Sequence, residues 1–177
     1  GEIDVSRYSL ENAESIVLTI SDNEDIFVPA RNAAFASMLS VNTVQPPSGD
    51  LRPHVTAQVK LGSFGYVSPF VRYSHNFTDR LAFTMSGEYV YADNDYPFTL
   101  RNGGTTMREK RTNSRMNSAH AEAGFIWQTG DNSRLDGKIY YYDNNRRLPG
   151  QVRYYTDMSG ERLHVRHFFA QAQYRVW

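Results

Sequence analysis

From residue 54 onward, apolar and polar side chains alternate with a period of two. Because successive residues of a strand point to opposite faces, each alternating segment predicts a β-strand with one apolar and one polar face. The alternation is weaker over 67–75 and 135–143, and Leu163 and Val165 are out of phase with the last segment, which predicts a bulge or a late strand start there. The apolar positions of the four clearest segments are Val55, Ala57, Val59 and Leu61; Leu81, Phe83, Met85, Tyr89 and Tyr91; Ala119, Ala121, Ala123, Phe125 and Trp127; and Phe168, Ala170, Ala172, Tyr174 and Val176.

The connections between these segments alternate in length. Residues 76–80 and 128–133 are short polar turns, whereas 92–116 and 143–161 are long and polar; only the first connection, 62–65, departs by being short. Outer-membrane barrels have short periplasmic turns, long extracellular loops and strands of about 9 to 11 residues with aromatic side chains near their ends. The candidate interfacial aromatic residues are Phe64, Tyr66, Tyr91, Trp127 and Tyr141.

The composition limits the classes of function. An aromatic content of 14% with a mean hydropathy of −0.58 fits amphipathic strands, and the net charge of zero argues against a nucleic-acid binder that neutralises phosphates. With no cysteine, disulfides, thiolate zinc sites and a cysteine nucleophile are excluded. Because no run of about 18 apolar residues occurs, the sequence encodes no transmembrane helix, and strands are the remaining way to span a bilayer.

The first 48 residues differ in texture from the rest. An apolar segment at 15–20 precedes the acidic run Asp22–Asp25, and residues 29–41 are rich in small side chains, as in a segment packed against another backbone. Pro46–Gly49 then interrupts the chain. We therefore expect a small mixed α/β unit at 1–48 and a strand-rich unit at 49–177.

Several stretches, in order, resemble TonB-dependent receptors, particularly the cobalamin or siderophore receptors of Bacteroidetes. Ser9–Ile16 resembles the plug segment in which a strand follows a helix, and Ala34–Thr43 resembles the small-residue stretch that closes the plug, although alanines stand where glycine pairs are usual. Lys60–Gly65 resembles the first barrel strand with its tip, and Asn94–Phe98, Arg101–Asn102 and 140–150 resemble barrel loops. The resemblance covers nearly the whole chain.

This resemblance implies a mainly β fold: an antiparallel transmembrane β-barrel portion of about six strands at 49–177, preceded by the C-terminal part of a small α/β plug domain at 1–48. It implies a bacterial outer-membrane location, energy transduction by TonB through a plug segment outside this sequence, and uptake of a scarce nutrient such as cobalamin or a ferric siderophore. No cofactor and no enzymatic activity are expected. Two open sheet edges would make such a fragment self-associate.

Ligand binding is expected at the loops. The basic run from Arg108 to Arg115 fits lipopolysaccharide or an anionic ligand, and Tyr96 and Phe98 fit stacking on a ligand, although a solvated loop is the commoner arrangement. The candidate ligand-binding residues are Tyr96, Phe98, Arg101, Arg108 and Arg111. On the polar faces of the strands, Glu88 and Glu122 are expected to line the barrel interior, with Lys60, Arg72, His120 and Lys138 as possible partners.

Catalytic and metal signatures are weak. No Ser-His-Asp order, nucleophile elbow or phosphate-cradling loop occurs. His164 and His167 fall on opposite faces of a strand, and Asp22–Asp25 lacks the spacing of an EF-hand loop. Two alternatives to the receptor stay open: a complete small outer-membrane barrel with a structural or adhesive role, and a soluble β-sandwich binding module.

Overall fold

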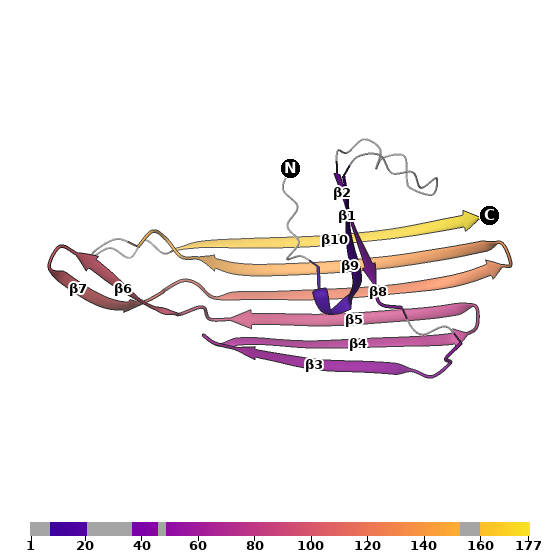
Figure 1. Cartoon of the computed structure of the whole chain (residues 1–177), viewed down its shortest axis with the longest axis horizontal. Coiled ribbons are helices and arrows are strands. Elements are labelled where there is room, and N and C mark those ends of the chain that lie inside the picture. The colour runs from indigo at the N-terminus through magenta and orange to yellow at the C-terminus, as the bar shows by residue number, and fades with distance from the viewer. Residues whose placement is uncertain (1–7, 21–36, 46–48, 153–159) are drawn as a thin grey trace.

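The computed structural model describes residues 8–20, 37–45, 49–152 and 160–177. Its main element is a six-stranded sheet in the order β10-β9-β8-β5-β4-β3, in which every neighbouring pair is antiparallel (Figure 1). The expectation of a mainly β fold with about six antiparallel strands is confirmed. The strands are β3 (His54–Gly62), β4 (Tyr66–Thr78), β5 (Leu81–Ala92), β8 (Met116–Gly130), β9 (Ser133–Leu148) and β10 (Glu161–Val176).

The two faces of this sheet are opposite in character. One cross-strand row runs Val55, Tyr73, Met85, Ala123, Ile139, Ala170, and the neighbouring row runs Thr56, Arg72, Ser86, Glu122, Tyr140, Phe169. We call the first the outer face and the second the inner face. The four alternating patterns read from the sequence are thereby confirmed, since all their apolar positions fall on the outer face.

Burial follows the inner face. All strand residues of the described sheet that are buried lie there, including the aromatic side chains of Phe70, Tyr140 and Tyr142, at 3–4% exposure. The outer face exposes its apolar side chains: Val55, Val59 and Phe168 are 67%, 63% and 68% exposed. A sheet in a water-soluble protein buries its apolar face, whereas this sheet exposes it.

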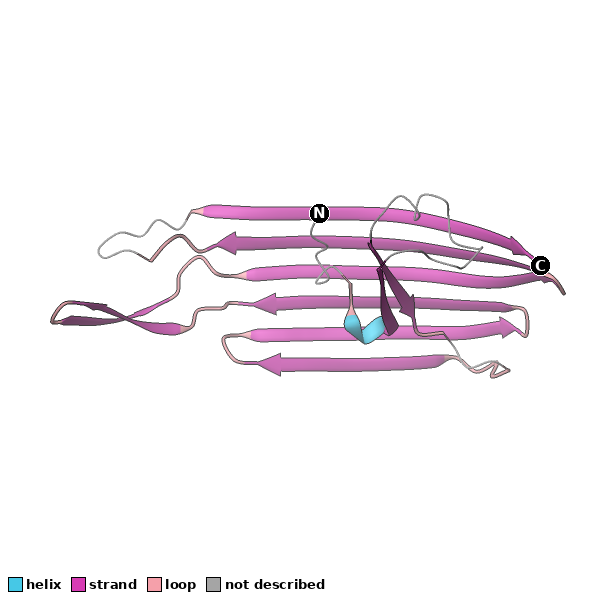
Figure 2. Ribbon diagram, turned by 45° about the horizontal axis from the view of Figure 1, so that its top comes forward, coloured by secondary structure: helices cyan, strands magenta, loops and turns pink. Residues whose placement is uncertain are grey.

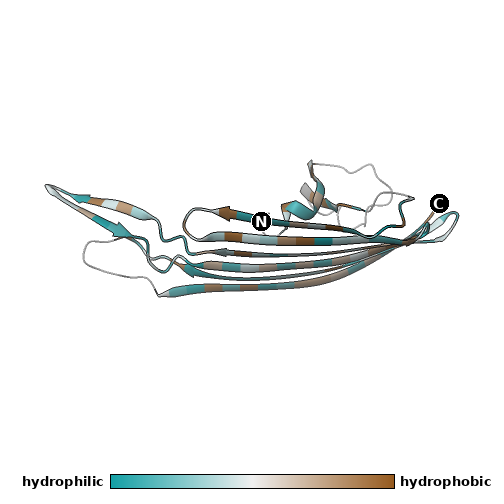
Figure 3. Ribbon diagram, turned by 90° about the horizontal axis from the view of Figure 1, so that it is seen from below, coloured by the Kyte–Doolittle hydropathy of each residue, from teal (hydrophilic) through white to brown (hydrophobic). Residues whose placement is uncertain are grey.

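A short N-terminal unit lies across the inner face. It consists of a 3-10 turn, η2 (Leu10–Asn12), and the antiparallel hairpin of β1 (Ala13–Ile20) and β2 (Ser37–Thr43), with one register shift between Ala13 and Ser15. Seen from the edge of the sheet, this unit stands on one side of the curved sheet and the other side is open (Figure 3). The described part of 1–48 thus holds strands and one 3-10 turn, while 1–7, 21–36 and 46–48 lie outside the described residues.

The connections at the two ends of the sheet differ as expected. At one end Asp79-Arg80 and Asp131-Asn132 are two-residue turns, and at the other end lie the long connections. The connection at 92–116 is more than a polar loop, because it contains the hairpin of β6 (Pro97–Asn102) and β7 (Thr105–Lys110), which projects beyond the sheet (Figure 2). We call the end of the sheet that carries the long connections the loop end, and the opposite end, with the two-residue turns, the turn end.

Three expectations from the sequence are wrong. Five of the six strands have 12 to 16 residues, longer than the expected 9 to 11, and β9 and β10 continue past the apolar band into the loop end. β10 pairs with β9 in unbroken register from Glu161, so Leu163 and Val165 mark no bulge or late start; they lie on the inner face. Tyr66 shares the inner face with Ser68 and Phe70, so it is no candidate for an outer aromatic girdle.

Glycine allows one close contact on the outer face. Gly137 of β9 is the register partner of Phe125, and a Cβ at Gly137 would fall on the Phe125 ring. The ring therefore covers the glycine, an arrangement that strengthens cross-strand packing. No helix among the described residues is long and apolar enough to cross a membrane.

Candidate functional site

The centre of the inner face holds an ion pair that is also hydrogen-bonded to the N-terminal unit. Lys138 of β9 and Glu122 of β8 form a salt bridge of 3.0 Å, and their side chains are 19% and 15% exposed. The amide Nδ2 of Asn12 donates to the same Glu122 Oε1 at 3.0 Å, and Asn12 is 5% exposed. The predicted pairing of Glu122 with Lys138 is confirmed, and Glu122 also fixes the turn η2 to the sheet.

A second contact joins the other side of the same turn to β3 and β4. The ammonium group of Lys60 pairs with the carboxylate of Glu11, and Arg72 Nη1 donates to the carbonyl oxygen of Glu11 at 3.2 Å. Glu88 instead accepts from Ser68 Oγ at 3.2 Å. The two cations were therefore predicted on the correct face, but both reach a residue of the N-terminal unit.

Sequence reasoning missed Glu11 and Asn12 because their partners are distant in the chain. Asn12 is 110 positions from Glu122, and Glu11 is 49 positions from Lys60. No local spacing connects them. Their position in the stretch that resembles a plug segment is the signal that could have drawn attention to them. Tyr8 adds an aromatic contact to Tyr140 at a ring-centroid distance of 5.7 Å.

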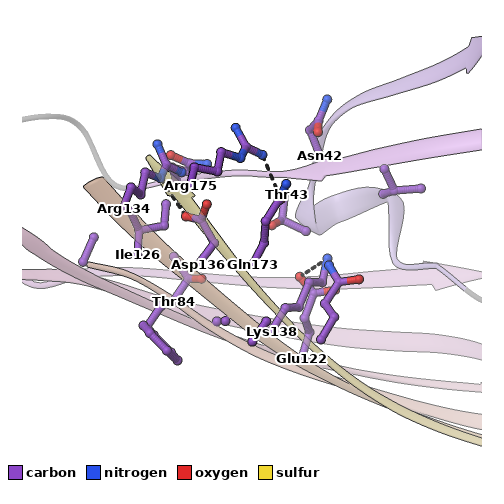
Figure 4. Close-up of a pocket in the computed structure, with 18 residues that line it drawn as sticks. Asn42, Thr43, Thr84, Glu122, Ile126, Arg134, Asp136, Lys138, Gln173 and Arg175 are labelled. Carbon is purple, nitrogen blue, oxygen red and sulfur yellow. Dashed lines mark hydrogen bonds and ion pairs between the residues drawn. The ribbon is translucent and has the colours of Figure 1, made fainter. Parts of the chain in front are cut away.

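A polar cavity of about 380 Å³ lies beside these contacts, between β2 and the inner face of β5, β8, β9 and β10 (Figure 4). Arg134 and Asp136 pair across 2.7 Å, and Arg175 Nη2 donates to Gln173 Oε1 at 2.9 Å. The Nε of Arg175 is buried and has no hydrogen-bond partner within the described part of the chain. Val41, Asn42, Thr43 and Gln45 supply the wall on the hairpin side.

The walls of this cavity carry hydrogen-bonding groups of both charges. The cavity holds three cationic side chains, Arg134, Lys138 and Arg175, and two carboxylates, Glu122 and Asp136. Each carboxylate pairs with one of these cations, Glu122 with Lys138 and Asp136 with Arg134. Because the walls can form hydrogen bonds, water can enter this cavity between the hairpin and the sheet, which we call the polar seam.

The predicted ligand-binding residues do not converge on one point at the loop end. Tyr96 contacts Phe64 and Phe98 at ring-centroid distances of 6.1 and 6.5 Å. Arg101 and Arg108 share the other face of the β6–β7 hairpin from Phe98, because Arg101 pairs with Thr106 and Arg108 with Thr99. The guanidinium of Arg111 donates to the carbonyl oxygens of Pro149 and Gly150, at 3.3 and 2.8 Å. Arg111 thus holds two loops together.

A compact network at the base of this hairpin fixes it to the sheet. Asp93 accepts from the Tyr91 hydroxyl at 2.7 Å and from Arg115 Nε at 3.1 Å, and its backbone N–H donates to the Phe64 carbonyl. These two side-chain hydrogen bonds, first that of Tyr91, hold the pKa of Asp93 below its ordinary value of 3.8. A cavity of about 340 Å³ opens here, lined by Asp93, Asp95, Arg111, Asn113, Ser114, Arg115 and Arg147.

The other candidate positions lie apart. His164 is on the outer face and contacts Asp143, whereas His167 pairs in register with the inner residue Tyr142, so the two histidines face opposite sides as predicted. Within the described ranges, no three His, Asp or Glu side chains come together as a metal-binding group. The acidic run Asp22–Asp25 lies outside the described residues.

No protein-family model matches the chain, and no curated protein matches it significantly.

Proposed function

We propose that this chain is part of a TonB-dependent receptor of the bacterial outer membrane, with residues 49–177 as the first strands of its β-barrel and 1–48 as the rear of its plug. One observation carries the proposal: the N-terminal unit is held by part-buried polar contacts on the inner face, while the apolar outer face is open. A plug inside a barrel wall requires that arrangement.

The dimensions of the outer face support this proposal. On β5 the apolar outer positions run from Leu81 to Tyr91, ten residue steps or about 33 Å along the strand, which at a strand tilt of about 40° spans about 25 Å. An outer-membrane barrel carries an apolar band about 25 Å tall. Aromatic side chains stand near both limits, with Tyr89, Tyr91 and Tyr141 toward the loop end and Trp127 and Tyr174 toward the turn end.

In this proposal the chain binds and admits a scarce nutrient, cobalamin or a ferric siderophore, without covalent chemistry. The loop end faces outward, where Tyr96, Phe98, Arg101, Arg108 and Arg111 are the candidate ligand contacts. TonB acts from the periplasm through a plug segment outside this sequence, and the polar seam beside the hairpin is the route that plug movement would widen.

A complete small barrel with a structural or adhesive role is the second candidate function. The projecting β6–β7 hairpin favours it, since such an extension suits adhesion. However, small barrels have at least eight strands, and the described sheet has six with open edges at β3 and β10. A soluble β-sandwich has less support, because within the described ranges no second sheet covers the apolar face.

The membrane part of the proposal is tested by tryptophan fluorescence. The chain has two tryptophans, so Trp177→Phe leaves Trp127 as the only emitter. In vesicles with brominated acyl chains, Trp127 on the outer face should be strongly quenched. A matched variant, Trp127→Phe with Gln173→Trp in the same background, moves the emitter to the inner face and should resist quenching. Equal quenching of both emitters would contradict the assignment of the faces.

The receptor part is tested by uptake in cells. Disrupting the gene should abolish growth when cobalamin or a ferric siderophore is the only source of that nutrient, and loss of TonB should give the same defect. Growth that needs the gene but not TonB would favour a different class of outer-membrane protein.

A further inference from the structure

The outer face changes from apolar to basic toward the loop end. Beyond Phe168 on β10, the next outward positions are Arg166, His164 and Arg162, and all three side chains are exposed. Their register partners on β9 are Asp143, Asn145 and Arg147. This cluster therefore carries three arginines and one histidine against a single carboxylate.

The internal contacts of the cluster leave cationic donors available. Asp143 accepts from Arg166 Nε at 2.9 Å and from His164 Nε2 at 3.1 Å. The Arg166 side chain is 63% exposed, and its ion pair with Asp143 uses Nε. Arg166 also contacts Tyr141, but a guanidinium has five N–H donors, so donors are left for another oxygen. Arg162 likewise uses Nε, toward Asn145 Oδ1 at 2.6 Å.

An apolar groove of about 490 Å³ adjoins this basic cluster on the same face. Its floor is made by the small residues Gly87, Ala121 and Ala123, and its walls by larger side chains of the neighbouring strands. These are Val71, Tyr73 and Met85 on one side and Ile139, Tyr141 and Phe168 on the other. The groove adjoins the cluster on the same face. Phe168 lies two positions after Arg166 on β10, and Tyr141 lies two positions before Asp143 on β9.

We propose that this surface binds one lipid with a net anionic phosphate headgroup, from the leaflet on the loop side, with an acyl chain in the groove and the phosphate on Arg166 and Arg162. Guanidinium groups bind phosphate oxygens with paired charge-assisted hydrogen bonds, and the groove matches an acyl chain because the atoms it exposes are almost all apolar. The inference rests on the proposed membrane location. It goes beyond that function because a barrel wall needs no preference for any lipid.

The test uses the full chain in micelles of a zwitterionic detergent, with native mass spectrometry to count bound lipid. The probe is diphosphoryl lipid A, compared with phosphatidylcholine and with inorganic phosphate. Lipid A should be retained at one per chain, phosphatidylcholine should be lost, and phosphate should not compete. Competition by inorganic phosphate at similar concentration would show a simple anion site and overturn the lipid assignment, as would equal retention of both lipids.

Two variants and one control separate the two halves of the site. Arg166→Gln should weaken lipid A binding about tenfold, since one charge-assisted hydrogen-bonded contact is lost. Gly87→Leu should weaken it by filling the groove; a Cβ there meets no atom closer than 3.9 Å, so the sheet can accept it. Arg80→Gln removes the same charge from the opposite end of the sheet and should leave binding unchanged.

Equal losses in Arg166→Gln and Arg80→Gln would overturn the proposal, because only the total charge would then matter. Failure of the proposed function is distinguishable from failure of this inference. If Trp127 is quenched by brominated lipid while lipid A shows no preference, the membrane location stands and only the lipid site is wrong.

Discussion

Replacing Ile139 with arginine tests the central physical claim, that the outer face contacts lipid. Ile139 lies in the cross-strand row of Met85 and Ala123. On β8, Ala123 is four residues from both Ala119 and Trp127, the outermost apolar positions of that strand. Ile139 is therefore about 13 Å along the strand from either limit of the apolar band, near its middle. Its side chain is 51% exposed, so arginine meets no steric barrier in water.

The expected magnitude depends on what surrounds the face. At the midplane of a bilayer, an arginine on the lipid face of a barrel costs about 2–4 kcal/mol of the free energy of unfolding. On a water-exposed surface the same substitution changes it by no more than about 0.5 kcal/mol. The two environments therefore differ by at least about 1.5 kcal/mol, more than a tenfold change in the unfolding equilibrium.

The assay is unfolding by urea in lipid vesicles, followed by tryptophan fluorescence. The matched control is Gln171→Arg, which places the same charge on the inner face, opposite Lys138 in the register. Ile139→Arg should be destabilised by about 2–4 kcal/mol and the control by much less. A change below about 0.5 kcal/mol for Ile139→Arg would refute a lipid-facing outer surface.

Three further predictions follow from particular contacts. Gly137→Ala should lower the free energy of unfolding by about 1–3 kcal/mol, because the aromatic ring that covers this glycine must move. Gly87→Ala, where an added Cβ meets no atom closer than 3.9 Å, should lower it by less than about 1 kcal/mol, and urea unfolding measures both changes. Glu122→Ala should weaken the hairpin contact by about 2 kcal/mol, because Lys138 and Asn12 both lose their acceptor. Glu11→Ala should weaken it by only about 0.5 kcal/mol, because its partner Lys60 is 41% exposed. Amide hydrogen exchange in β1 and β2 measures both effects, and equal losses would contradict the burial argument. The pKa of Asp93 is lowered from 3.8, so its stabilising contacts are complete at neutral pH and are lost as pH falls through that lowered pKa; a carboxyl NMR titration with a midpoint at or above 3.8 would contradict this.

Much of the sheet was predictable from the sequence. Alternation at positions such as Val55, Met85 and Phe125 fixes which side chains share a face, because the side-chain period of a strand is two. The polar turns at 79–80 and 131–132 then require neighbouring strands to be antiparallel. The residues that share a face and the strands that are neighbours therefore depend on local sequence, and both can be predicted from it.

The prediction failed where local alternation ends before the strand does. β9 and β10 continue for several residues beyond the apolar band, because backbone pairing between them persists after the outer side chains become polar. The same reason explains Leu163 and Val165, which are apolar on the inner face without any break in register. The β6–β7 hairpin was missed because its strands of six residues lie in a polar connection.

The sequence by itself determined the two-faced strands, the order in which they follow one another and the end of the sheet that carries the long loops. Only the tertiary structure decided which face is covered, since the contact of Glu11 with Lys60 and of Asn12 with Glu122 joins segments with no shared local pattern. It also decided that Arg111 joins two loops and that Arg162 and Arg166 adjoin an apolar groove. These are consequences of strand register and chain crossing, which depend on residues far apart in the chain.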